Sequence, residues 1–185
     1  TFEGIPVSGS KFLLNDLLKE KWGFKGFVVS DWNSFGEMVN WGYAKDIKDA
    51  VYKAFVAGSM MDMETRGMIK YIPELIREGK ITTAQLDDAV GRILTTKFNL
   101  GLFENPYKYS DAKRQQTEIF TAQNRKSALE ASQGSIILLK NNNHTLPLNI
   151  ATKKIALIGE LAFNKAHAFD FWIGRGDSSS SVTLK

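Results

Sequence analysis

Short apolar runs that end on acidic residues alternate with amphipathic segments between residues 24 and 101. The first run, residues 26–30, is followed at once by Asp31 and Trp32. The second run, residues 59–64, is again apolar and is interrupted by carboxylates. Strands that alternate with helices of about 10–15 residues are typical of a parallel sheet. The order therefore predicts an α/β fold with acidic groups at the C-terminal ends of its strands, where catalytic groups sit in barrels of this kind.

Four segments have the residue spacing of amphipathic helices. Their apolar residues recur at intervals of three and four, which places them on one helical face. A glycine follows each segment, as is typical of a helix C-terminus. Thr82 and Gln85 form a capping-box pattern at the start of the last segment. The predicted helices cover residues 15–21 and 45–57, a segment from residue 68 that Gly79 closes, and a segment from residue 82 that Gly101 ends.

Residues 104–120 break this alternation. They are polar, contain one proline and show no sustained period, which predicts a linker that runs over a surface. Beyond them, residues 121–133 predict a helix, and the apolar runs 135–141 and 154–159 predict two strands of a second domain that is cut off. The expected organisation is a first domain at 1–103, a linker at 104–120 and a second domain at 121–185.

The composition limits the chemistry that the chain can support. There is no cysteine, and the two histidines, His144 and His167, have no second good ligand nearby in the sequence, so neither a zinc site nor a Ser/His/Asp triad is expected. The net charge of +4 comes from interspersed charges rather than from a basic run, so no nucleic-acid partner is expected. No apolar run approaches the roughly 20 residues of a membrane span.

Several stretches, taken in order, carry a resemblance to a known family. They are KEKWGFKGFVVSDW, AGSMMDME, AVGRILTTKFNLGLFENPY, SIILLKNNNHTLPL and KIALIGELA with the later RGDSSSSVTL. Together they resemble successive motifs of glycoside hydrolase family 3, and the likeness is greatest to its bacterial periplasmic β-glucosidase branch. The resemblance implies a (β/α)8 barrel followed by a linker and an α/β sandwich domain. A complete barrel needs roughly 250 residues, so we expect a fragment: the C-terminal part of the barrel in 1–103 and the start of the sandwich in 121–185.

The resemblance also implies a retaining β-glucosidase that removes terminal glucose from small β-glucosides or oligosaccharides. In the family, the aspartate of the S-D-W motif is the nucleophile, and that position here is Asp31. Such a mechanism needs two carboxyl groups roughly 5–5.5 Å apart and no cofactor or metal. The resemblance implies that the acid/base glutamate lies beyond Lys185, so the chain alone is expected to be inactive. The resemblance to the periplasmic β-glucosidase branch also implies a periplasmic or secreted location.

Trp32 and Asp62 are the other candidate site residues. The flat indole of Trp32 could pack on a sugar ring, and core packing is the alternative. Asp62 could line the sugar pocket or hydrogen-bond a loop, and the structural role is favoured. For Asp31 itself, the alternative is that it caps the helix that follows the strand.

Three departures from the family pattern leave the sugar preference open. Trp41 stands where a histidine is usual, Met60 and Met61 replace one acidic site, and Gly134 replaces a larger residue. A β-xylosidase or arabinosidase of the same family is therefore the alternative function, and a non-catalytic carbohydrate-binding protein is the alternative from another class. The RGD triplet at 175–177 falls inside the family pattern and is not interpreted as an adhesion motif.

Overall fold

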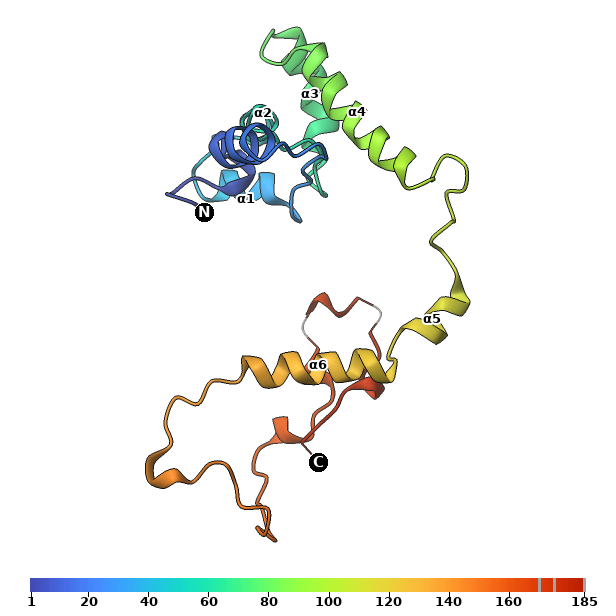
Figure 1. Ribbon diagram of the computed structural model, residues 1–185. Helices are drawn as coiled ribbons and strands as arrows, with labels where there is room; N and C mark the ends of the chain where they lie inside the picture. Colours follow the sequence, from blue (N-terminus) through green and yellow to red (C-terminus); the bar gives the residue numbers. More distant parts are fainter. Residues whose placement is uncertain (170, 175, 185) are drawn as a thin grey trace. The chain divides into compact units, whose positions relative to one another are not determined.

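A computed structural model describes residues 1–169, 171–174 and 176–184. The chain divides into two compact units, Thr1–Ile119 and Phe120–Lys185 (Figure 1). The first unit consists of helices with two extended segments between them, and the second contains one longer helix and extended chain. Arg175, the first residue of the RGD triplet, lies outside the described residues.

The helices of the first unit follow the predicted order. All four predicted segments are helical, but residues 12–21 form a π-helix, in which the hydrogen-bonded turn is wider than in an α-helix. Two further α-helices, α1 and α5, lie in stretches for which no helix was predicted. The elements are η1 (Val7–Gly9), η2 (Phe12–Lys21), α1 (Ser34–Asn40), α2 (Ile47–Ala57), α3 (Gly67–Arg77), α4 (Thr83–Asn99) and α5 (Ala112–Glu118).

The core of the first unit lies where α2 packs against α1 and α3. Helix α2 buries Ala50, Val51 and Ala54 completely, as their spacing predicts for one helical face. Phe35 and Met38 anchor α1, because both side chains are fully buried one turn apart. The core therefore fixes the helices that flank both extended segments.

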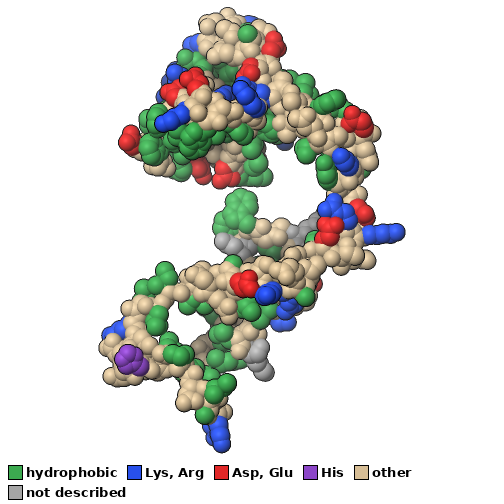
Figure 2. All heavy atoms as spheres, in the orientation of Figure 1, with side chains coloured by type: hydrophobic (Ala, Val, Ile, Leu, Met, Phe, Trp, Pro, Cys, Tyr) green, Lys and Arg blue, Asp and Glu red, His purple; other side chains and the backbone are tan. Residues whose placement is uncertain are grey.

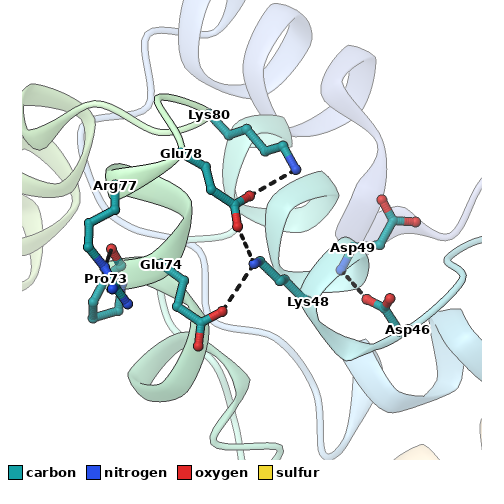
Figure 3. Close-up of polar contacts among 8 residues, drawn as sticks. All are labelled: Asp46, Lys48, Asp49, Pro73, Glu74, Arg77, Glu78 and Lys80. Atoms are coloured by element: carbon teal, nitrogen blue, oxygen red, sulfur yellow. Dashed lines mark hydrogen bonds and ion pairs between the residues drawn. The ribbon is translucent and has the colours of Figure 1, made fainter.

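A group of charged side chains joins α2 to α3 outside this core (Figure 3). Lys48 Nζ on α2 lies 3.0 Å from Glu74 Oε2 and 2.5 Å from Glu78 Oε1, both on the α3 side. Lys80 Nζ lies 3.0 Å from the other oxygen of Glu78. At the start of α2, Asp46 Oδ1 accepts a hydrogen bond from the backbone N–H of Asp49 at 2.8 Å. These contacts tie the end of α3 to the beginning of α2.

The two extended segments of the first unit, the first around Val29 and the second around Met61, lie side by side in parallel. Val29 and Met61 form a parallel bridge, in which Met61 N donates to Val28 O at 3.1 Å and Ser30 N donates to Met61 O at 2.9 Å. The parallel direction agrees with the prediction, but across the described residues the pairing does not extend into a longer ladder.

The predicted linker, residues 104–120, contains a short helix. Helix α5 spans Ala112–Glu118 and begins at Asp111, whose side chain accepts a hydrogen bond from Lys113 N at 2.8 Å. Arg114 and Glu118 pair one turn apart at 2.8 Å. A cap and an ion pair stabilise this short helix. Its sequence has no apolar period, so hydrophobic periodicity does not predict it.

The second unit contains α6 (Ala122–Ser135), which agrees with the predicted helix, and several single-turn helices. The predicted strands at 135–141 and 154–159 are wrong for this structure: no residue of either run, all of them described, forms a β-bridge. Their side chains stay exposed, as in Leu139 at 92% and Ile158 at 92%, and hydrophobic side chains are visible on this surface in Figure 2. The single-turn helices are η3 (Asn142–His144), η4 (Glu160–Ala162), η5 (Ala166–Ala168), η6 (Phe171–Ile173) and η7 (Ser178–Ser180).

No helix in the described ranges is both long enough and apolar enough to cross a membrane.

Candidate active site

Asp31 follows directly on the first extended segment and precedes α1 by three residues. Its side chain is exposed, and Asp31 Oδ1 accepts a hydrogen bond from the backbone N–H of Trp32 at 2.6 Å. The N-cap position of α1 is Asn33, in a left-handed conformation with φ of 53°. Asp31 contributes only its backbone carbonyl to the start of α1, which accepts from Ser34 N at 3.2 Å. The carboxylate of Asp31 is therefore not a helix cap.

Ser30 fixes the backbone on either side of Asp31. Its side chain is buried, and its hydroxyl accepts a hydrogen bond from Met63 N at 2.9 Å and donates one to Asp31 O at 3.0 Å. On the other side of Asp31, the backbone N–H of Asn33 donates to Met63 O at 3.1 Å. The chain is thus held to the neighbouring segment at Ser30 and at Asn33, on either side of Asp31, while the Asp31 carboxylate stays exposed.

An open hollow of roughly 370 Å³ borders Asp31. This volume falls in the range of about 300–1,000 Å³ that is typical of small-molecule sites. Asp31, Ser34, Glu37 and Trp41 line it from the turn and from α1 and its end. Two carboxylates, a hydroxyl and an indole are groups that can accept hydrogen bonds from a polyhydroxylated ligand and cover its apolar C–H face. The hollow is chemically suited to a sugar.

The other two predicted site residues lie differently. Trp32 is 53% exposed and adjoins Asp31, but neither Trp32 nor Asp62 is among the described residues that line the hollow. Asp62 accepts hydrogen bonds from the Thr65 hydroxyl and, at 3.2 Å, from Met68 N. Asp62 thus hydrogen-bonds the loop before α3 and the first turn of that helix.

Sequence reasoning did not identify Ser34 and Glu37 as residues of this hollow. Together with Asp31 and Trp41 they follow one another at intervals of three, three and four, the spacing of one helical face. A prediction of α1 would have revealed this alignment. The segment is only seven residues long, so its period is too short to stand out.

Within the part of the chain that the structure describes, no group of three or more His, Asp or Glu side chains could hold a metal ion.

Comparison with known proteins gives the family. The family model described as "Glycosyl hydrolase family 3 N terminal domain" matches residues 1–96. Over 187 aligned residues the chain is 38% identical to the "Periplasmic beta-glucosidase" of Salmonella typhimurium, a match that covers 100% of this chain and 24% of that protein. It is 32% identical over 163 residues to a "Xylan 1,4-beta-xylosidase" of Xylanibacter ruminicola, covering 86% of this chain and 19% of that protein.

Solved structures give the same answer. The β-glucosidase of Listeria innocua matches with a TM-score of 0.65 and 37% identity, over 79% of this chain and 20% of that chain. A mutant of that protein in complex with laminaribiose matches with the same TM-score of 0.65 at 36% identity. The chain spans about a quarter of the length of the Salmonella relative. These matches confirm the resemblance seen in the sequence: the chain belongs to glycoside hydrolase family 3.

Proposed function

We propose that the protein to which this chain belongs is a retaining β-glucosidase that removes terminal β-linked glucose from small glucosides, with Asp31 as its nucleophile. The observation that carries this proposal is the setting of Asp31. Its carboxylate is exposed beside a hollow suited to a sugar, on a backbone that is hydrogen-bonded to the neighbouring segment on both sides. The 38% identity to a protein named β-glucosidase supports the choice of sugar.

The proposed fold is the one that the sequence predicts. Residues 1–103 form the C-terminal part of a (β/α)8 barrel, 104–120 the linker and 121–185 the start of an α/β sandwich domain. The parallel bridge between Val29 and Met61 supports this, since adjacent strands of such a barrel run parallel. Asp31 then lies at the C-terminal end of its strand, the end at which barrel enzymes carry their catalytic groups.

In the proposed mechanism, a carboxylate oxygen of Asp31 attacks the anomeric carbon of the glucoside. The bond from that carbon to the leaving oxygen breaks, and the leaving oxygen takes a proton from the acid/base residue. Water then attacks the glucosyl–Asp31 ester, giving its proton back to the same residue and releasing glucose with its β-configuration retained. The Trp32 N–H holds Asp31 Oδ1, so we assign the attack to Oδ2. The acid/base is a glutamate outside these 185 residues.

The test is to trap the nucleophile on the full-length natural protein. A 2-deoxy-2-fluoro-β-glucoside with a good leaving group slows the second step more than the first, so the glycosyl-enzyme accumulates. Peptide mapping by mass spectrometry should find the label on Asp31, and an Asp31→Asn variant should remain unlabelled. A label on another residue, or turnover of β-glucosides without any label, would overturn the proposal.

A β-xylosidase is the second candidate, because the relatives include a "Xylan 1,4-beta-xylosidase" at 32% identity. It would use Asp31 in the same way and differ in the residues that contact the sugar. Comparing kcat/KM for aryl β-glucosides and β-xylosides on the same full-length protein decides between them. A non-catalytic carbohydrate-binding protein, the alternative from another class, would bind both sugars without turnover and would do so equally well after Asp31→Asn.

We further propose that the 185 residues alone are inactive, since they span about a quarter of the Salmonella relative and leave the acid/base outside. The name of that relative supports a periplasmic location for the whole protein. Turnover by the purified 185-residue chain would contradict the first of these statements, and retention of the full-length protein in the cytoplasmic fraction would contradict the second.

A further inference from the structure

We propose that Ser30 is a positioning residue for Asp31. Its hydroxyl acts by changing the hydrogen-bond pairing between the two extended segments at the residue directly before Asp31. This inference rests on the proposed role of Asp31 as nucleophile. Ser30 is 4% exposed and is one of three buried polar residues, all serines, in the described part of the chain. Its hydroxyl both accepts from Met63 N at 2.9 Å and donates to Asp31 O at 3.0 Å.

A parallel pair of strands has a fixed pattern of backbone hydrogen bonds. Around the bridge of Val29 with Met61, Met61 N donates to Val28 O and Ser30 N donates to Met61 O, as a parallel ladder requires. If the ladder continued, the next two bonds would run from Met63 N to the Ser30 carbonyl and from Trp32 N to Met63 O.

Neither of these two bonds forms. Met63 N donates to the Ser30 hydroxyl instead of the Ser30 carbonyl, at 2.9 Å. The donor to Met63 O is Asn33 N, at 3.1 Å, one residue later than a continued ladder would use. The side chain of Ser30 thus takes the place of a backbone acceptor, and the pairing of the following residues shifts by one.

This shift releases the backbone N–H of Trp32 from the ladder. That N–H donates to Asp31 Oδ1 at 2.6 Å, the hydrogen bond that orients the proposed nucleophile. A hydroxyl suits the position because it can accept and donate at once, which joins the two segments and holds the Asp31 carbonyl. Without it, the ladder can continue in register, and Trp32 N would turn toward Met63 O and away from the carboxylate.

The experiment measures how fast the full-length protein and its variants are inactivated by the 2-deoxy-2-fluoro-β-glucoside. The saturation curve separates the binding constant of the glucoside from the rate constant for formation of the glycosyl-enzyme. For Ser30→Ala we expect that rate constant to fall roughly 10- to 100-fold, since small displacements of a reacting group cost rates of this order. We expect the binding constant to stay within about threefold, because the two hydrogen bonds of the hydroxyl go to Met63 N and Asp31 O, within the protein.

Three further variants separate positioning from a purely structural role. Ser30→Thr keeps the hydroxyl and Ser30→Val replaces it with a methyl group of nearly the same size, so the ratio of their rate constants measures the hydroxyl itself. We expect Ser30→Thr to be at least about tenfold faster than Ser30→Val. Ser10→Ala is the control, since Ser10 is 3% exposed and its hydroxyl accepts a local hydrogen bond from Leu13 N at 3.4 Å. Its rate constant should equal that of the wild type.

Thermal unfolding midpoints are measured for every variant, and kinetics are recorded well below the lowest of them. If Ser30→Ala does not fold, the Thr and Val pair still provides the comparison. Equal rate constants for Thr and Val, or a loss that lies in the binding constant, would overturn the inference while leaving Asp31 as the labelled nucleophile. A wild-type protein that is never labelled would overturn the proposed function, and this inference with it.

Discussion

Lys48 on α2 donates a hydrogen bond to Glu78 at the end of α3 over 2.5 Å (Figure 3). The hydrogen bonds from Lys48 and Lys80 lower the pKa of the Glu78 carboxyl from 4.5 to about 2, and the Lys48 bond is the larger cause. In turn, the hydrogen bonds from Lys48 to Glu78 and Glu74 raise the pKa of Lys48 above 10.5. Lys48 lies at the start of α2 and Glu78 directly after α3, so this contact joins the two helices between which the segment with Met61 and Met63 lies in the chain.

The first prediction concerns acid stability. A carboxyl group whose pKa is lower in the folded state stabilises the fold above its unfolded pKa, and this contribution disappears as the pH falls through the folded pKa. Glu78 should therefore contribute fully above about pH 4.5 and progressively less down to about pH 2. We expect the difference in thermal midpoint between wild type and Glu78→Gln to shrink across this window. A constant difference from pH 6 to pH 2 would contradict the assignment.

The second prediction concerns Asp62. Replacing it with alanine removes the acceptors of the Thr65 hydroxyl and Met68 N at the start of α3. We expect the free energy of unfolding to fall by about 1–2 kcal/mol, as for the loss of a helix cap. Urea unfolding of the full-length protein measures this change, and Glu64→Ala in the same loop should stay within about 0.5 kcal/mol of wild type. Unchanged stability together with a higher KM would instead make Asp62 a substrate-binding residue.

The third prediction tests the capping box of α4. Thr82 Oγ1 accepts from Gln85 N at 3.2 Å, and Gln85 Oε1 accepts from Thr82 N at 2.8 Å. Thr82→Ala removes one half of this reciprocal pair and should lower the free energy of unfolding by about 1 kcal/mol. Thr83→Ala, one residue further along, removes a hydroxyl outside the box and is the matched control. Equal effects of the two substitutions would show that the cap does not stabilise α4.

The predictable parts of the fold are those stabilised by local signals of sufficient length. The apolar face of α2 and the Thr82–Gln85 capping box each depend on residues that are close together in the sequence, and both are present in the structure. Gly58 follows α2 with φ of 117°, a left-handed conformation that glycine adopts without strain, and it ends the helix as expected. Such elements need no information from distant parts of the chain.

The missed parts depend on short or distant contacts. Helix α1 has only two turns, so Phe35 and Met38 cannot establish a period by themselves. Residues 135–141 have the composition of a strand, but a strand forms only against a partner, and the described residues supply none. The apolar composition of this segment therefore indicates that it can form a strand, but not that it forms one in this chain.

The candidate site also contains one residue that the sequence could single out and one residue whose role it could not predict. Asp31 could be singled out because an apolar run ends on it, and it is exposed at that point. The role of Ser30 could not be predicted, because the partner of its hydroxyl is Met63, and that pairing depends on the register of two segments about thirty residues apart.

The last prediction tests the direction of attack. Asp31→Gly in the full-length protein should lower turnover of an aryl β-glucoside by roughly 10⁴- to 10⁶-fold, as the loss of a nucleophile does. The space left by the carboxylate admits azide, which should attack the anomeric carbon from the face that Asp31 occupied and give α-glucosyl azide, identified by NMR. Glu37→Gly is the matched control, because it removes another carboxylate that lines the same hollow, and azide should yield no glucosyl azide with it. Azide can reach the face opposite the leaving group only where the nucleophilic carboxylate has been removed. If the Glu37 variant alone formed α-glucosyl azide, the nucleophile would therefore be Glu37 and not Asp31.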